Sequence, residues 1–458
     1  MKKLILFLAL LSVLLTSACT AIEQPIEEQQ DYSIEDDQGY PSGGDQGYPG
    51  GDEQVNQDGY AKSSLNRESA PSVNQEQIQI LAQDNTNFAL SFYDRIRQED
   101  GNIIFSPISL SLALSMALAG AENPTEEAML EALQFSLPEE EIYPTFNALL
   151  LAIEESQELP MEDSDGDEFQ LNIANSIWGQ GGYDFEQEFL DTLAKNYGAG
   201  MYLVDYIGNP EIARQLINDW VEEETQEKIK DLIPPGAIDT LTRLVLANAI
   251  YFNASWQHPF DEDSTEKAPF ITLDGSEIEV DMMRLFGERL LYTQEASYQA
   301  VNLPYLSNDF SMTVVVPDQG SFADFEDGFS SELITHIQNN LSSQGVNLQM
   351  PKFNYESTIS ANDPLAALGM SNAFDPQSAD FSGITELEKL FISEVLHKAT
   401  ITVDEEGTEA AAATAIIMRA TSIDPQEPIK FTIDRPFIYI IQHNPTGSIL
   451  FMGRVTQP

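Results

Sequence analysis

Four histidines are the side chains in this 458-residue chain best suited to acid–base or metal chemistry. None of them lies in a His-Glu-x-x-His pattern, and the sequence contains neither a Gly-x-Ser-x-Gly elbow nor a glycine-rich phosphate loop. No nucleophile stands at a recognisable spacing from a base. The histidines are His258, His336, His397 and His443. The sequence therefore does not indicate an enzyme, and we expect no catalytic residue, no metal and no cofactor.

An acidic run at residues 162–168 (EDSDGDE) is the stretch closest in type to a cation site. An EF-hand loop requires glycine at its sixth position, counted from the first aspartate ligand, and Gly166 comes too early for that spacing. We therefore interpret the run as a solvated loop.

The most informative segment lies near the carboxyl end, where Glu406 and Gly407 precede an almost unbroken run of small residues that extends to Ala415. The chain is strand-like on both sides of this run, at 399–403 and 437–441. Long stretches without secondary structure in a compact domain are usually functional or disordered. One interpretation is a segment that can enter a sheet as an extra strand, because only small side chains pass easily between two existing strands.

Alternate residues of this run differ in charge, and a strand places them on opposite faces. One set is Thr408, Ala410, Ala412, Thr414 and Ile416, and the other is Glu409, Ala411, Ala413, Ala415 and Ile417. The only charge belongs to the second set, so the first set can face a core without burying an ion. An alanine-rich helix is the alternative that composition alone leaves open.

Several further motifs accompany the small-residue run in a fixed order. They are NIIFSPIS at 102–109, LVLANAIYF at 244–252 with Trp256 and Phe260, SMTVVVP at 311–317, MPKF at 350–353, ADFSG at 379–383, Ile392-Ser393 with His397-Lys-Ala399, DRPF at 434–437 and FMGRV at 451–455. Together they resemble the serpin family over nearly all of the chain from about residue 79 to Pro458. The ordered set is far more specific than any one of its members.

The resemblance implies an α+β serpin fold, in which helices pack around three β-sheets and the reactive-centre loop is exposed. In keeping with this order, the sequence pattern predicts helices at 85–97, 109–119, 186–197 and 211–228, and strands dominate after Leu241. We expect the folded serpin domain to span residues 78–458.

The resemblance also assigns roles to individual residues. The hinge of the loop corresponds to Glu406, Gly407, Thr408, Glu409, Ala410, Ala411, Ala412 and Ala413. The shutter and breach, where the central sheet must open, correspond to Ser106, Ser109, Asn248, Trp256 and His397. Taken by itself, a histidine beside a strand is usually a core residue. The resemblance implies that His397 is hydrogen-bonded to Asn248 beneath that sheet.

On this resemblance, the chain is a protease inhibitor, not an enzyme. A serine protease cleaves the exposed loop and is trapped as an acyl-enzyme when the hinge inserts into the sheet. The family spacing from Gly407 places the reactive bond at Thr421–Ser422, which suits an elastase-like or subtilisin-like protease. The alternative bond, Arg419–Ala420, suits a trypsin-like protease. A non-inhibitory serpin that acts as a binding or structural protein is the other function class.

The amino terminus resembles an export signal. Lys2 and Lys3 precede an apolar run at 4–15 that is too short to span a membrane. Cys19 is the only cysteine, and it stands where a bacterial lipoprotein signal would be cleaved and lipidated. We expect residues 1–19 to be a signal peptide and the protein to be exported, either as a lipoprotein of the cell envelope or as a secreted, extracellular protein.

Residues 20–77 are rich in Gln, Asp, Glu, Gly and Ser. Such a composition buries too little apolar surface to offset the entropy of ordering, which predicts a disordered acidic linker. The formal net charge of −54 argues against nucleic acid as a partner, and residues 143–168 offer no Lys or Arg to heparin. We expect a monomer whose only membrane contact is a lipid at Cys19.

Overall fold

The computed structural model describes residues 59–158, 170–408 and 427–458 of the chain, all of which belong to one compact unit. The predicted signal peptide with Cys19 and the acidic run at 162–168 lie outside the described residues. Within the described part of the chain, no helix combines the length and the apolar character that crossing a membrane requires.

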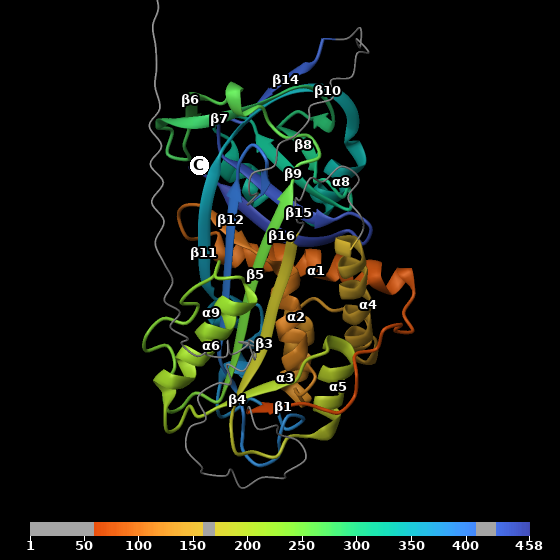
Figure 1. Ribbon diagram of the computed structural model, residues 1–458, viewed down its shortest axis with the longest axis vertical. Helices are drawn as coiled ribbons and strands as arrows, with labels where there is room; N and C mark the ends of the chain where they lie inside the picture. Colours follow the sequence, from red (N-terminus) through yellow and green to blue (C-terminus); the bar gives the residue numbers. More distant parts are fainter. Residues whose placement is uncertain (1–58, 159–169, 409–426) are drawn as a thin grey trace, which may run out of the picture. The chain divides into compact units, whose positions relative to one another are not determined.

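Most helices of the first half lie around the lower part of the molecule in Figure 1, beside strands β3 and β5. The described helices are α1 Gln75–Ile96, α2 Pro107–Leu118, α3 Asn123–Ala132, α4 Glu139–Glu158, α5 Gln187–Tyr197, α6 Pro210–Glu224, α7 Phe322–Asp327, α8 Ser331–Asn340 and α9 Asn362–Ala367, with 3₁₀ turns at Glu262–Ser264 and Met370–Phe374. Helix α1 begins ten residues before the predicted start because a capping box of Asn74 and Gln77 closes its first turn. Helix α2 is buried on every side, and the Ser106 hydroxyl accepts from the Ser109 N–H at its start.

The first sheet has seven strands in the order β1-β4-β3-β5-β13-β12-β11. Their bounds are β1 Tyr60–Ala61, β3 Gln170–Gln180, β4 Met201–Val204, β5 Leu244–Ser255, β11 Phe353–Ser360, β12 Ile392–Val403 and β13 Gly407–Thr408. The two long central strands, β5 and β12, run parallel, with Asn248 opposite His397. Strands β3 and β11 flank them as antiparallel neighbours.

The second sheet has nine strands, in the order β14-β10-β7-β8-β9-β15-β16-β2 with β6 also on β7. Their bounds are β2 Ile103–Phe105, β6 Glu266–Ile271, β7 Glu277–Gln294, β8 Tyr298–Pro304, β9 Phe310–Pro317, β10 Ser342–Pro351, β14 Ile429–Thr432, β15 Phe437–His443 and β16 Ser448–Val455. Three sheets were predicted. In the described residues, the hydrogen-bonded strands form two sheets. The 18-residue strand β7 pairs with β6 and β10 and, near its carboxyl end, also with β8, and so joins these strands into one sheet.

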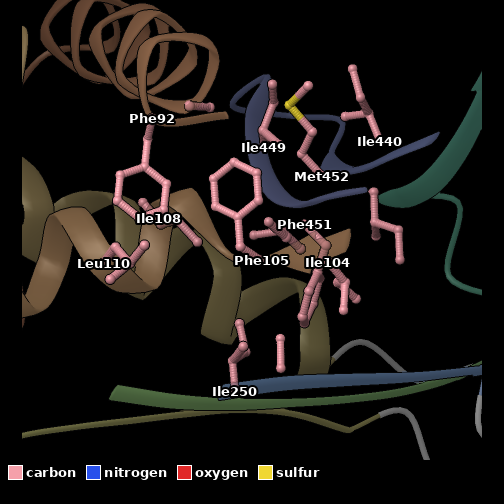
Figure 2. Close-up of a cluster of buried hydrophobic side chains, with 14 of the residues drawn as sticks. Phe92, Ile104, Phe105, Ile108, Leu110, Ile250, Ile440, Ile449, Phe451 and Met452 are labelled. Atoms are coloured by element: carbon pink, nitrogen blue, oxygen red, sulfur yellow. The ribbon is translucent and has the colours of Figure 1, made fainter. Parts of the chain in front are cut away.

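The main core lies between the two sheets and the helices α1 and α2. Figure 2 shows Phe92 of α1 and Ile108 of α2 gathered with Phe105 and Phe451, above Ile250 of β5. The ring centroids of Phe92 and Phe105 are 5.5 Å apart. Burial of each such side chain contributes about 1.5–3 kcal/mol to folding, so the core fixes α2 and its amino-terminal serines against the underside of β5.

Residues 59–77 are part of the folded domain, so the linker prediction is wrong for this stretch. Strand β1 extends the seven-stranded sheet by pairing with β4, and the ring of Tyr60 lies 4.5 Å from that of Tyr202. The Nε of Arg67 then donates to Asn147 Oδ1 of α4 at 2.7 Å. A two-residue strand carries too weak a hydrophobic pattern to be found by periodicity alone.

We predict that Arg67→Ala lowers the free energy of unfolding by about 1–2 kcal/mol, because it leaves the buried Asn147 amide oxygen without its donor. Denaturant unfolding monitored by circular dichroism measures the effect. Arg95→Ala is the matched control, since Arg95 makes only a 3.8 Å pair with Asp94. Equal stability of the two variants would show that residues 59–77 are not anchored through Arg67.

Candidate functional site at the seam between two parallel strands

The candidate site is the seam between β5 and β12. The two strands pair directly as far as Ile250 and Ala399, and beyond that point they separate. Strand β13 fills the gap, because Thr408 pairs with Ala254 on one side and with Val403 on the other. Both pairings are antiparallel, so β13 points from this end of the seam towards its closed part.

The first hinge residues lie inside the sheet. We expected the hinge to insert only after cleavage of an exposed loop, and this expectation is wrong for Gly407 and Thr408, which already pair with β5 and β12. A Cβ on Gly407 would lie 2.2 Å from the carbonyl oxygen of Ala254, so this strand position accepts only glycine. The Thr408 side chain is 1% exposed, and its hydroxyl lies 2.8 Å from the Tyr305 hydroxyl. Thr408, the first member of the uncharged alternate set, thus faces the core.

Trp256 holds the open end of the seam together. Its indole N–H donates to the carbonyl oxygen of Asp404 at 3.1 Å, and its backbone N–H donates to that of Glu406 at 2.8 Å. Its ring stacks on Tyr305 with 4.6 Å between centroids and 11° between planes. Tyr305 therefore links the predicted Trp256 to Thr408, although the sequence analysis did not single it out.

Glu405 is a second anchor that sequence reasoning missed. Burial alone would raise the pKa of its carboxyl, but hydrogen bonds from Lys352 and Thr265 outweigh burial and hold that pKa below its usual range. The side chain is 5% exposed, and its backbone oxygen accepts from the Phe260 N–H at 2.9 Å. The sequence features that could have indicated this anchor are the acidic pair directly before Gly407 and the lysine of the MPKF motif, which is Lys352.

His397 lies beneath the closed part of the seam and is fully buried. Its Nε2 accepts the backbone N–H of Ser106 at 3.0 Å, which assigns the ring proton to Nδ1. That Nδ1–H donates to the side-chain oxygen of Asn248, its pairing partner across the seam. Burial lowers the pKa of His397 to about 3, so the ring is neutral at physiological pH.

Asn248 extends this network to helix α2 and strand β3. Its amide donates to the Ser109 hydroxyl and to the side-chain oxygen of Asn175, a residue that sequence reasoning did not find. The Ser109 hydroxyl in turn donates to Asn175 at 3.1 Å. The structure thus brings together four of the predicted residues, Ser106, Ser109, Asn248 and His397, around one contact that must break when β5 and β12 part. Leaving either buried partner unsatisfied would cost about 1–3 kcal/mol.

The outer face of the seam is covered by the segment that follows α6. Lys398 of β12 donates to the carbonyl oxygen of Lys230 at 3.2 Å and pairs with Glu356 at 3.3 Å. Lys228 lies 5.4 Å from the ring centroid of Tyr251 on β5. The segment therefore contacts both seam strands, and widening the seam requires it to move.

The remaining predicted loop residues lie outside the described residues. They are Glu409, Ala410, Ala411, Ala412 and Ala413 of the hinge and Arg419, Ala420, Thr421 and Ser422 around the reactive bond. In the described ranges, no group of three or more His, Cys, Asp or Glu side chains is placed to hold a metal.

One serine–histidine contact has the elements of a nucleophile–base pair. The Ser156 hydroxyl lies 2.9 Å from Nε2 of His443, and Nδ1 of that ring faces the Thr446 hydroxyl instead of a carboxylate. Both Ser156 and His443 are buried, and burial lowers the pKa of His443 to about 4. Lacking exposure and an orienting acid, the pair serves packing.

Comparisons with known proteins agree with this geometry. The sequence model of the family described as "Serpin (serine protease inhibitor)" matches residues 83–458. Leukocyte elastase inhibitor of Sus scrofa is 38% identical over 395 residues, which cover 82% of this chain and 99% of that protein. A serpin-like protein of Methanosarcina acetivorans is 34% identical over 395 residues, which cover 84% of this chain and 90% of that protein.

Solved structures show the same arrangement of elements. Serpin48 of the insect Tenebrio molitor superposes with a TM-score of 0.72 at 33% identity, covering 83% of this chain and 98% of that chain. The thermophilic serpin tengpin, in its native state, gives a TM-score of 0.76 at 29% identity, covering 87% and 100%. The mixed α and β architecture predicted from the sequence is confirmed.

We predict that His397 makes stability depend on pH. The unfolded chain binds a proton at His397 below about pH 6.5, whereas the folded chain binds it only near the folded pKa of about 3. Stability is therefore constant above pH 6.5 and falls below it by about 1.4 kcal/mol per pH unit for this group. His443, with its pKa of about 4, adds a similar slope over a narrower range.

Denaturant unfolding between pH 4 and 7 measures the dependence of stability on pH and distinguishes the contribution of His397 from that of His443. His397→Gln should remove the share of the slope that His397 contributes, whereas Thr335→Ala, a change at an exposed residue of α8 that carries no titratable group, should leave the slope unchanged. An unaltered slope in His397→Gln would contradict the assignment of a neutral, buried ring.

Proposed function

This chain belongs to the serpin family, and from that premise we propose that it inhibits a serine protease as a suicide substrate. The observation that carries the proposal is the position of β13. This strand is the start of the small-residue run, and it already lies between β5 and β12. A non-inhibitory serpin that binds a partner or supports a structure needs no such run, so the seated hinge favours inhibition over that alternative.

The reaction begins when the protease accepts the loop as a substrate. Its serine oxygen bonds to the scissile carbonyl carbon, the peptide C–N bond breaks, and the new amine leaves with a proton. The upstream segment stays esterified to the protease through its new carboxyl end, and it can move because it is no longer joined to the downstream segment. It then enters the seam behind β13, and the attached protease is carried along the sheet before water can hydrolyse the ester.

The pairing register of β13 fixes where each later residue would lie after insertion. Each step beyond Thr408 pairs with one step back along β5 and one step back along β12. Thr414 would then lie opposite both Asn248 and His397. It belongs to the same alternate set as Thr408, so its hydroxyl would face the core and could accept from His397 and donate to Asn248.

Insertion is favourable because it replaces the single ladder between β5 and β12 by two ladders, one on each side of the inserted strand, for a net gain of about one ladder. Each backbone hydrogen bond contributes about 1 kcal/mol net, so roughly ten inserted residues supply on the order of ten kcal/mol. A threonine hydroxyl between Asn248 and His397 would also replace the hydrogen bond that the parting strands lose. The small side chains keep the entry of the strand free of steric obstruction.

The target follows from the residue before the cleaved bond. Thr421–Ser422 would suit an elastase-like or subtilisin-like protease, and a relative named leukocyte elastase inhibitor supports this choice. Cleavage at Arg419–Ala420 would instead indicate a trypsin-like protease. We further propose that the inhibitor acts as a monomer without heparin or another cofactor, exported and either lipidated at Cys19 or secreted.

We predict that Thr408→Arg converts the protein from inhibitor to substrate. The arginine would have to replace a side chain that is 1% exposed against Tyr305, and an unpaired buried charge costs several kcal/mol. Denaturing gels with a panel of serine proteases should show a stable covalent complex for the natural sequence and mostly cleaved protein for the variant. The mass of the released peptide identifies the reactive bond.

Thr335→Arg is the control for this substitution, because Thr335 is exposed on α8, away from the seam. It should form the complex as the natural sequence does. An undiminished complex yield in Thr408→Arg would contradict insertion through this residue, and a natural sequence that forms no covalent complex with any protease would favour the non-inhibitory alternative.

We predict that cleavage of the loop raises the melting temperature of the isolated protein, since the inserted strand completes the sheet. Thr414→Val should reduce this gain, by about 1–3 kcal/mol of unfolding free energy, because valine leaves Asn248 and His397 without a bridging hydroxyl. The uncut forms of both proteins should melt alike. Identical melting of the two cut forms would show that Thr414 does not reach this site.

A further inference from the structure

The two most exposed large hydrophobic side chains of the described residues lie at the same end of the seam. Leu241 is 68% exposed and Leu387 is 64% exposed. Leu241 precedes β5 and Leu387 precedes β12, and these two strands are parallel. Strand β13 pairs near the carboxyl ends of β5 and β12, so both leucines lie at the opposite end of the sheet.

The two loops that carry these leucines are fixed to each other. The Nε of Arg243 lies 3.4 Å from Oε1 of Glu388, and the Tyr183 hydroxyl donates to the same carboxylate. Each leucine also sits in a turn closed by a side chain, since the Leu241 N–H donates to Asp239 at 2.7 Å and the Leu387 N–H donates to Thr385 at 3.3 Å. The leucines are thus presented to solvent by ordered backbone on both sides of the seam.

After insertion in the register of β13, the cleaved end of the loop would reach this place. Counted along β5 from the pairing of Thr408 with Ala254, Arg419 would come opposite Arg243 and Thr421 opposite Leu241. Strand β5 begins at Leu244 and β12 at Ile392, so the chain would leave the sheet between the two leucine loops. A protease esterified to Thr421 or Arg419 would be held within a few residue lengths of them, at about 3.3 Å per residue.

We propose that Leu241 and Leu387 form a contact surface for the acylated protease at the end of its movement. This inference rests on the proposed function and names a part of the chain that acts after insertion. Burial of the two leucines against the protease would favour the state in which the protease is pressed onto this end of the sheet. The contact would oppose the return of the protease to its active geometry and so slow the hydrolysis of the ester.

The test compares Leu241→Glu/Leu387→Glu with Leu273→Glu/Leu291→Glu, two exposed leucines of which Leu273 lies in the turn between β6 and β7 and Leu291 lies on β7. A protease that forms the complex with the natural sequence is used, and release of active protease from the isolated complex is followed over time. We expect the first variant to form the complex at the same rate but to release protease about tenfold faster, which corresponds to a difference of about 1.4 kcal/mol. The control pair should release it at the natural rate.

Further measurements distinguish failure of the leucine contact from failure of insertion or of inhibition. Melting of the cleaved proteins without protease should be unchanged, which shows that insertion itself is intact. Equal release rates for the two variants would overturn the inference while leaving inhibition in place. The inference would also be overturned if the natural protein sedimented as a dimer and the Leu241→Glu/Leu387→Glu variant as a monomer, because the leucines would then serve a dimer contact. Absence of a complex with the natural sequence would overturn the proposed function, and this inference with it.

Discussion

The parallel pairing of β5 and β12 is the constraint on which the remaining structure depends. An added strand that is antiparallel to one of these strands is automatically antiparallel to the other, and β13 shows this arrangement at one end of the seam. The sheet can therefore gain a strand in its middle without rearranging its other pairings. Two buried strands that can still accept a third between them make this domain suited to a strand-insertion mechanism.

The polar groups along the seam connect β5 and β12 with the elements around them, so breaking these contacts is part of the cost of opening it. At the end that holds β13, Trp256 and Glu405 attach the segment before the hinge to both sheets. Beneath the closed part, His397 and Asn248 satisfy each other and are fully buried, so separating them exposes a donor and an acceptor to an apolar interior. A hydroxyl carried in by the inserted strand can replace what is lost, whereas an apolar side chain cannot. In the mechanism proposed above, the network would therefore make opening of the seam costly until the inserted strand fills it.

Local sequence patterns predicted much of the fold. Helices α2 and α5 lie within two residues of their predicted bounds, because their apolar spacing and caps are local. The same patterns did not predict β1 or residues 59–77, where order comes from contacts with Tyr202 and Asn147 far along the chain. The merging of two predicted sheets into one also escaped, since it depends on hydrogen bonds that the long strand β7 makes at its two ends.

The small-residue run and its alternation of charge could be recognised in the sequence, because they are properties of side chains and of their spacing. The roles of His397, Asn248, Ser106 and Ser109 were implied only by the resemblance to the serpin family. Only the tertiary structure decided that Gly407 and Thr408 are already seated, that Tyr305, Asn175 and Glu405 complete the network, and that two leucines mark the far end of the seam. Burial and register are set by partners distant in the chain, and so they cannot be read from local spacing.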